Sequence, residues 1–198
     1  MNFIKKFLIL SKLNIFLQSF LAGILIAFAF APFDLFFPAI ISVSWFYLVL
    51  DKQISLKVAN KKIFLLGLSY GVGYFLAANY WISISLLVDV KRFWFLLPFS
   101  ITLFPLVLGI FFTLLALTTK LIFEKFQLQQ YQKVLAFTSI WLFLELVRSY
   151  IFTGFPWNLI GYTMMFSDYG FQSAAVLGVY GLSFLAVLFA LIPTLYLS

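Results

Sequence analysis

The chain has 198 residues, of which 65% are apolar, 22% aromatic and only 10% charged, and its net charge is +7. Soluble globular proteins have about a quarter charged residues, so this composition excludes a cytosolic enzyme, a disordered protein and a disulfide-rich secreted module. The chain has no cysteine and no histidine, which excludes a thiol nucleophile and an imidazole base or metal ligand. We expect an all-α integral membrane protein without a metal or cofactor, whose positive charge reflects its orientation in the membrane and not binding to nucleic acid.

Clusters of charged residues separate long apolar stretches. A helix rises about 1.5 Å per residue, so roughly 20 apolar residues cross the hydrocarbon core. The stretches are too long for barrel strands and do not alternate in polarity. Pro98 and Pro105 predict a kink in the fourth stretch. We expect a single membrane domain over residues 1–198 with no soluble domain and with spans at about 7–31, 35–50, 63–88, 93–119, 134–152 and 171–197.

The basic residues predict the orientation of these spans. With the N-terminus inside, only Lys91 and Arg92 fall in an outer connection, and Arg148 lies near the outer end of the fifth span. Basic residues concentrate on the cytoplasmic side of membrane proteins, so we expect both termini to be cytoplasmic. The ten lysines in the inner segments are Lys5, Lys6, Lys12, Lys52, Lys57, Lys61, Lys62, Lys120, Lys125 and Lys133.

The N-terminal segment resembles a signal peptide. Lysines precede an apolar run that ends in small residues around Ala29 and Ala31, a pattern typical of a cleavage site. The run is too long for a signal h-region, and Pro32 next to the potential cut would hinder cleavage. We expect the segment to be retained as the first span.

Small residues recur at helical spacing in two of the expected spans. The third span has Gly67 and Gly71 four residues apart, and the first has Gly23 and Ala27 at the same spacing. Small residues let helix backbones approach closely in a bilayer. We interpret both stripes as packing surfaces.

Glu145 and Arg148 are charged residues inside an apolar span. They lie three residues apart, so they share a helix face and can pair. A charge within a span costs about 2.5–3.5 kcal/mol on insertion scales, so it must face protein or water. Two interpretations stay open: a self-neutralised pair that fixes the register of the helix, or polar groups that line a cavity near the outer surface.

The segment after this span is not helical in pattern. Gly154 permits unusual backbone angles, Pro156 lacks a backbone donor, and Phe155 before the proline is biased to an extended shape. At membrane depth such a segment must be covered by protein or line a wet cavity. Trp157 and Tyr162 could alternatively be interfacial aromatic residues.

Two further outer segments carry polar residues. Asn79 and Trp81 are followed by Ser83 and Ser85, and because no base is near either serine, we expect a hydrogen-bonding or cavity-lining role. Asp34 follows a proline in a tight outer turn, which explains its presence without any function.

Four motifs in order resemble a known family. They are Phe30-Ala31-Pro32-Phe33-Asp34, Gly71 to Phe75 leading to Asn79-Tyr80-Trp81, Glu145 and Arg148 followed by Thr153-Gly154-Phe155-Pro156-Trp157, and Gly178-Val179-Tyr180-Gly181. The third motif is the most specific. On these motifs the chain resembles the N-terminal membrane half of the bacterial apolipoprotein N-acyltransferases.

The resemblance implies a location, an activity and partners. Members of the family move an acyl chain from a phospholipid to the free amine of the diacylglyceryl-cysteine of a lipoprotein, at the outer face of the inner membrane. The reaction uses a thioester on a cysteine of a nitrilase-like domain, assisted by a glutamate and a lysine. These 198 residues contain no cysteine, so we expect no catalytic residue here and a truncated or split gene product that is inactive alone.

For this chain the resemblance implies phospholipid and lipoprotein substrates, with a separately encoded nitrilase-like half as a further expected partner. We expect the substrate to meet the cavity or its outer mouth. The candidate binding residues are Asn79, Trp81, Glu145, Arg148, Phe155, Pro156, Trp157 and Tyr162.

Two other functions are compatible with a polar outer region that has no nucleophile. One is a stand-alone protein that binds or translocates lipid without catalysis. The other is a six-helix solute transporter, which predicts polar residues at mid-bilayer and an inverted repeat. The sequence shows neither of these features, so the transporter ranks last.

Overall fold

The computed structural model describes residues 14–151, 154–165 and 167–197, and within these ranges the regular elements are helices, with no strand. Lys5, Lys6 and Lys12, with the start of the first expected span and its signal-like pattern, lie outside the described residues. The long helices are α2 (Ile15–Ile26), α3 (Phe36–Ser55), α4 (Asn60–Ala78), α8 (Leu103–Lys125), α9 (Gln130–Tyr150) and α10 (Asp168–Leu191). The short ones are α5 (Tyr80–Leu86), α6 (Val90–Phe93), α7 (Leu97–Ile101) and the 3₁₀ turns η2 (Ala27–Ala29), η3 (Leu87–Asp89), η4 (Trp94–Leu96), η6 (Ile160–Met164) and η7 (Ile192–Tyr196).

Helix α4 packs between α2 and α8 through glycines. A Cβ on Gly23 of α2 would come within 2.1 Å of the Tyr70 carbonyl oxygen, and one on Gly67 would come within 2.5 Å of the Phe112 carbonyl oxygen. Any larger residue would therefore force these backbones apart. The small-residue stripes predicted from the sequence are confirmed as helix contacts.

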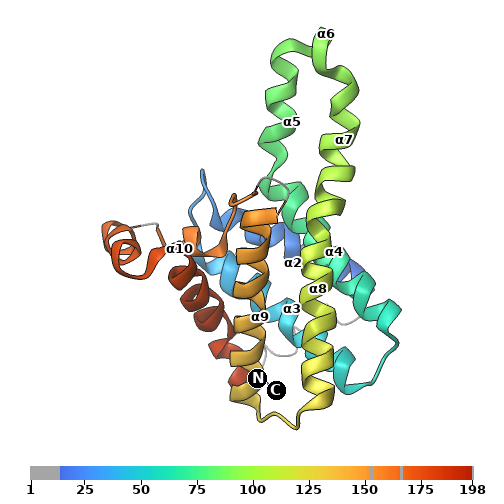
Figure 1. The fold of residues 1–198 in the computed structure, drawn as a ribbon, viewed down its shortest axis with the longest axis vertical. Helices are drawn as coiled ribbons and strands as arrows, with labels where there is room; N and C mark the ends of the chain where they lie inside the picture. Colours follow the sequence, from blue (N-terminus) through green and yellow to red (C-terminus); the bar gives the residue numbers. More distant parts are fainter. Residues whose placement is uncertain (1–13, 152–153, 166, 198) are drawn as a thin grey trace, which may run out of the picture.

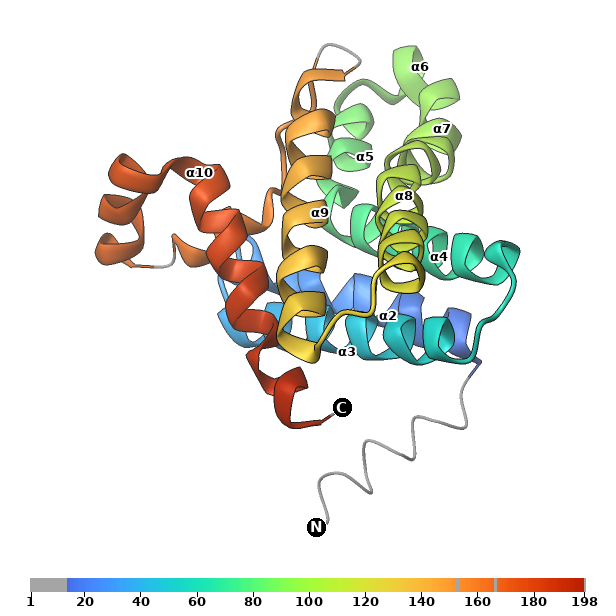
Figure 2. The same ribbon diagram turned by 60° about the horizontal axis from the view of Figure 1, so that its bottom comes forward.

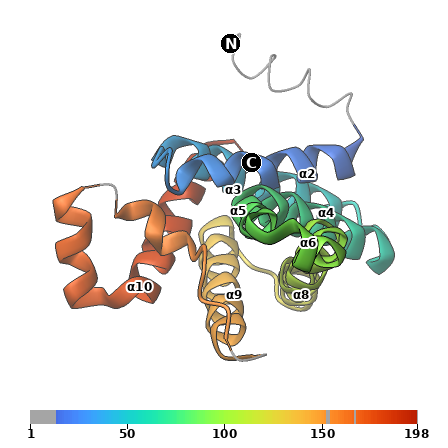
Figure 3. The same ribbon diagram turned by 90° about the horizontal axis from the view of Figure 1, so that it is seen from above.

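Aromatic side chains fill the space between α3, α4, α8 and α9. The ring of Tyr70 stacks on Phe46 with 4.1 Å between centroids, and Trp141 meets Phe112 edge-on at 5.0 Å. The Ser42 hydroxyl donates to the Ala22 carbonyl and also bonds to the Tyr70 hydroxyl. These contacts tie α2, α3 and α4 together, and α2 and α3 lie side by side (Figure 3).

The expected spans 63–88 and 93–119 are each interrupted. Helix α4 ends before Asn79, which has non-helical φ/ψ angles of −112° and 14°, and α5 to α7 then form a hairpin that projects beyond the other helices (Figure 1). Thr102 separates α7 from α8, and Pro105 lies in the first turn of α8, where a missing N–H leaves no helical bond unmade. Pro98 therefore lies in a short helix and Pro105 in the first turn of a new long helix, where the sequence predicted one kinked helix.

Helix α10 is divided at Gly178, whose φ of 66° and ψ of 170° are not helical. The first half turns away from the molecule (Figure 2), while the second half packs on α3 and α9. There the Ser44 hydroxyl of α3 donates to the Ala190 carbonyl. The expected span 171–197 is thus two segments with different directions.

The lysine-bearing ends of four helices meet at one end of the molecule. The Lys133 ammonium of α9 pairs with the Asp51 carboxylate of α3 at 2.9 Å. The Lys120 ammonium of α8 donates to the Asn60 side chain at the start of α4 at 2.7 Å.

By length and composition, the described stretches Tyr80–Lys125 and Asp168–Tyr196 are long and apolar enough to cross a membrane.

Candidate functional site

Residues 154–160, here called the GFPW loop, fold back against the last turns of α9. Gly154 makes the reversal with a φ of +87°, and a Cβ there would lie 2.5 Å from the Ser149 carbonyl oxygen. The Phe155 amide then donates to the Arg148 carbonyl at 3.1 Å. Only glycine suits this position, because it has no Cβ and adopts a positive φ freely. The reversal brings the loop backbone over the polar side chains of α9.

The Arg148 side chain of α9 binds the backbone of the GFPW loop. Its side chain is almost fully buried, and one guanidinium nitrogen donates to the Phe155 carbonyl at 3.0 Å and to the Trp157 carbonyl at 2.9 Å. The guanidinium carbon also lies 5.2 Å from the ring centroid of Phe75 and 5.8 Å from that of Phe155. Hydrogen bonds and aromatic faces together offset the cost of burying a charge.

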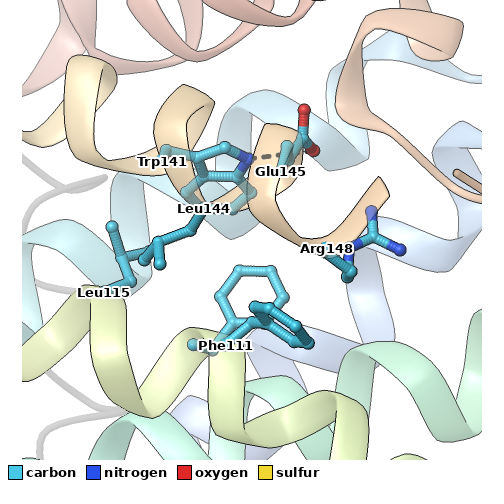
Figure 4. A pocket seen from close by; sticks show the side chains of 7 residues that line it. Phe111, Leu115, Trp141, Leu144, Glu145 and Arg148 are labelled. Atoms are coloured by element: carbon cyan, nitrogen blue, oxygen red, sulfur yellow. Dashed lines mark hydrogen bonds between the residues drawn. The ribbon is translucent and has the colours of Figure 1, made fainter. Parts of the chain in front are cut away.

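Glu145 holds the far end of the loop. Its Oε1 accepts from the Ile160 amide at 2.9 Å and from the Trp141 indole nitrogen at 3.1 Å, whereas its buried Oε2 has no hydrogen-bond partner among the described residues. Figure 4 shows Trp141, Glu145 and Arg148 on successive turns of α9, beside a cavity of about 20 Å³ that they line with Phe111 and its neighbours. Such a cavity holds about one water molecule.

The ion pair suggested by the spacing of Glu145 and Arg148 does not form. The two residues share a face of α9 as predicted, but they are not within ion-pair distance of each other in the described part of the chain. Each binds the GFPW loop backbone instead: the carboxylate accepts an amide, and the guanidinium donates to two carbonyls. A non-helical segment leaves backbone groups without helical partners, and these charged groups satisfy three of them.

A pair of asparagines attaches the loop to the break between α4 and α5. The Asn158 amide nitrogen donates to the Asn79 side-chain oxygen at 2.6 Å and to the Ala78 carbonyl at 3.3 Å. The Tyr74 hydroxyl of α4 donates to the Asn158 carbonyl. Asn79 is 4% exposed, and its own amide nitrogen has no partner in the described residues. The chain break at Asn79 thus gives the loop an anchor.

Sequence reasoning missed Asn158 and Tyr74. The sequence signals were weak. Asn158 follows the Phe-Pro-Trp order, and asparagine is enriched at positive φ, which the structure confirms here with a value of 54°. Tyr74 lies in the glycine-rich part of α4, where its hydroxyl is a polar group inside an apolar helix. A buried tyrosine hydroxyl usually finds a hydrogen-bond partner, and here the partner is the loop.

The outer surface of the GFPW loop borders a cleft of about 910 Å³, here called the aromatic cleft. Trp157 meets Trp81 of α5 edge-on, with 5.8 Å between ring centroids, and the two side chains are 57% and 43% exposed. The cleft gathers parts of the chain that are far apart in sequence. Its lining residues include Asp34, Tyr80, Trp81, Trp157, Tyr162 and Phe171.

The eight predicted binding residues therefore fall into separate places. Trp81, Trp157 and Tyr162 line the aromatic cleft, and Glu145 and Arg148 line the small cavity behind the loop. The other three, Asn79, Phe155 and Pro156, belong to the loop or its anchor, with Pro156 exposed. Asp34 was explained from sequence by its turn alone, yet it borders the cleft.

The groups gathered at the aromatic cleft are suited to binding a ligand. In the described residues no three acidic, histidine or cysteine side chains gather into a group that could hold a metal ion. Indole and phenol rings with a polar loop offer an amphiphilic molecule an apolar wall and hydrogen-bonding groups together.

Comparison with known proteins identifies the family. The family model for the apolipoprotein N-acyltransferase N-terminal domain matches residues 22–192. The chain belongs to the apolipoprotein N-acyltransferase family. The matched region contains the GFPW loop, the aromatic cleft and all eight predicted residues.

Apolipoprotein N-acyltransferases from several bacteria are similar to this chain. The Rickettsia bellii protein is 37% identical over 167 residues, which is 84% of this chain and 32% of the relative. The Brucella melitensis protein is 34% identical over 184 residues, 90% of this chain and 34% of the relative. For the Sinorhizobium fredii protein the identity is 32% over 200 residues, 96% of this chain and 36% of the relative. The chain thus spans about a third of the length of the apolipoprotein N-acyltransferases it matches.

Proposed function

We propose that the 198-residue chain forms the lipid-binding membrane domain of an apolipoprotein N-acyltransferase, and that the aromatic cleft admits the lipid substrates of this enzyme. The observation that carries the proposal is the GFPW loop. Its inner side is fixed by Glu145, Arg148 and Asn79, while its outer side presents Trp157 to a cleft of about 910 Å³. A rigid support behind exposed aromatic residues is what a binding surface needs. The eight residues predicted from sequence would act together, three by contact and the others by holding the loop.

The binding proposal can be tested on the purified chain in detergent micelles. We expect native mass spectrometry to show bound phospholipid, and a variant with both Trp81→Ala and Trp157→Ala to retain roughly five- to 150-fold less, because each of the two aromatic contacts contributes about 0.5–1.5 kcal/mol. Trp94→Ala is the matched control, since Trp94 is an exposed tryptophan on the hairpin outside the cleft lining. Equal lipid retention by the double variant and the control would contradict the proposal.

We further propose that the domain is a multi-pass protein of the bacterial inner membrane, with six spans and both termini in the cytoplasm. The meeting of the lysine-bearing ends of α3, α4, α8 and α9 supports this orientation. Because the chain has no cysteine, a single introduced one reports its own side. A membrane-impermeant maleimide added outside should label Lys91→Cys and should label Lys57→Cys only after permeabilisation. The reverse pattern would overturn the orientation.

Acyl transfer itself is proposed to need a part beyond these residues. The family resemblance implies a thiol nucleophile in a nitrilase-like domain, and these 198 residues contain no cysteine. We expect this chain alone not to rescue a cell depleted of the acyltransferase, whereas a full-length relative should rescue it. Rescue by the chain alone would show that the reacting group lies within it. A reading frame for a nitrilase-like part in the DNA downstream of the Ser198 codon would support a split enzyme, whereas unrelated sequence there would favour a degraded gene.

The alternative is a domain that moves lipid between leaflets without catalysis, which a cleft without a nucleophile also suits. The two functions differ in one measurement. A fluorescent phospholipid in vesicles containing the purified chain should stay in its leaflet if the cleft serves acyl transfer. Rapid exchange between leaflets that is lost in the Trp81→Ala, Trp157→Ala variant would favour translocation.

A further inference from the structure

The turn before α3 places an acidic residue at the edge of the aromatic cleft. The Phe33 and Asp34 amides both donate to the Phe30 carbonyl, at 3.0 and 3.1 Å, and the Leu35 amide donates to the Phe28 carbonyl at 3.1 Å. Asp34 has a φ of 50°, which aspartate and asparagine tolerate better than most residues. The backbone of the turn is thus fixed by its own hydrogen bonds, and the Asp34 side chain is not needed to close it.

The Asp34 carboxylate has no partner within the described part of the chain. The residue is exposed, and neither a hydrogen bond nor an ion pair of its side chain is found there. Among the described residues that line the aromatic cleft, Asp34 alone carries a charged side chain. No ion pair joins Asp34 and Arg148 in the described part of the chain, and the Arg148 guanidinium donates instead to the carbonyls of Phe155 and Trp157.

The cleft therefore combines one negative charge with several aromatic rings. Asp34 shares it with Tyr80, Trp81, Trp157 and Tyr162, each of which is at least 40% exposed. This placement is notable in a chain with a net charge of +7. A carboxylate beside electron-rich ring faces is complementary to an organic cation, because the charge and the ring quadrupoles both attract it.

We propose that Asp34 is a specificity-determining residue that binds the ammonium group of an amphiphile in the aromatic cleft. The inference rests on the proposed function and deepens it, by naming the charged group that the cleft selects. The ammonium has two possible sources with the same chemistry. One is the ethanolamine headgroup of a phospholipid, and the other is the free amine of a diacylglyceryl-cysteine peptide.

The test compares pairs of ligands in which one carries the ammonium group and the other does not. The purified chain in detergent is offered phosphatidylethanolamine and phosphatidylglycerol with the same acyl chains, in equal amounts, and native mass spectrometry counts each bound lipid. A second arm offers a diacylglyceryl-cysteine peptide with a free or an acetylated amine. A preference in the first arm identifies the headgroup as the source, and a preference in the second identifies the peptide amine.

Asp34→Asn removes the charge and keeps a residue that tolerates the positive φ. We expect the wild-type chain to prefer the ammonium ligand about three- to tenfold in at least one arm, and Asp34→Asn to bind both ligands of that arm equally. Asp89→Asn is the control, because Asp89 is an acidic residue on the hairpin outside the cleft lining. Its preference should stay at the wild-type value.

The outcomes separate this inference from the function it rests on. Lipid binding without an ammonium preference in either arm, or a preference that survives Asp34→Asn, overturns the role of Asp34 and leaves the lipid-binding domain standing. No binding of any of the four ligands overturns the proposed function, and with it the role of Asp34. Unchanged thermal unfolding of Asp34→Asn, measured alongside, excludes misfolding as the reason for a lost preference.

Discussion

The two sides of the GFPW loop differ sharply in their surroundings. Its inner side meets the buried groups of Glu145, Arg148 and Tyr74, which bond to its backbone. Its outer side presents Pro156 and Trp157 to the surface. The inner side is therefore specified by main-chain hydrogen bonds and the outer side by side-chain identity. Substitutions on the two sides should change different properties, stability on the inner side and ligand binding on the outer.

The largest effect on stability is expected from Arg148→Ala. It leaves the Phe155 and Trp157 carbonyls unpaired and removes the cation nearest in sequence to the buried Glu145. Each carbonyl left unpaired away from water costs about 1–3 kcal/mol, so the two together should cost about 2–6 kcal/mol, which corresponds to a fall of roughly 4–24 °C in the unfolding midpoint. Thermal unfolding in detergent measures it. Arg148→Lys keeps the charge but not the planar donors, so its unfolding midpoint should lie between those of the wild type and Arg148→Ala. A wild-type midpoint in Arg148→Ala would contradict the stabilising role of the inner side of the loop.

Glu145 allows a matched pair of substitutions. Glu145→Ala loses the bonds from Ile160 and Trp141, and we expect a loss of about 2–3 kcal/mol because two buried donors are left unpaired. Glu145→Gln keeps an oxygen for both donors, so its loss should stay under about 1 kcal/mol. The same unfolding assay compares the pair. Equal losses in both variants would mean that the carboxylate charge matters more than its hydrogen bonds.

A smaller effect is expected from Tyr74→Phe, which removes only the hydroxyl that donates to the Asn158 carbonyl. One neutral hydrogen bond contributes about 0.5–1.5 kcal/mol, a shift of a few degrees in the unfolding midpoint. Tyr80→Phe serves as the control, because Tyr80 is half exposed and lies on the cleft side. A larger shift in Tyr80→Phe than in Tyr74→Phe would contradict the prediction that contacts on the inner side of the loop, and not on the cleft side, determine stability.

The smallest change in stability is expected from Trp157→Ala. The inner bond at this residue uses the backbone carbonyl, which alanine keeps, and the indole is 57% exposed with an edge contact to Trp81. The loss should therefore stay below about 1 kcal/mol. Because lipid retention should fall in the same variant, parallel unfolding and binding measurements sharpen the contrast. If Trp157→Ala destabilised the protein as much as Arg148→Ala, the predicted difference between the two sides of the loop would be contradicted.

Much of the helical architecture could be predicted because it depends on local pattern. Apolar stretches and lysine clusters marked the long helices, and the glycine spacing marked the α2–α4 and α4–α8 contacts. The helix breaks were harder to predict. The high mean hydropathy continues through Asn79 and Gly178, so a window average does not register a single residue with non-helical angles.

The sequence predicted several residues of the site but not the hydrogen bonds that they form. Spacing shows that Glu145 and Arg148 share a helix face, and this much is confirmed. It does not show that Ile160, 15 residues along the chain, returns to bind the carboxylate. A loop that folds back offers main-chain partners that no side-chain pattern reveals. The attachment of Asn158 to Asn79 joins two side chains 79 positions apart, which no local spacing shows.

The backbone at Gly178 has a mechanical consequence for the cleft. Helix α10 is interrupted there, and no atom lies within 4 Å of the place where a Cβ would be. Phe171, on the segment before the break, lines the cleft, while the segment after it is packed on α3 and α9. The torsion angles of this one residue thus set the direction in which the segment that carries Phe171 leaves the packed half of α10, and a side chain at this position would be strained by the positive φ.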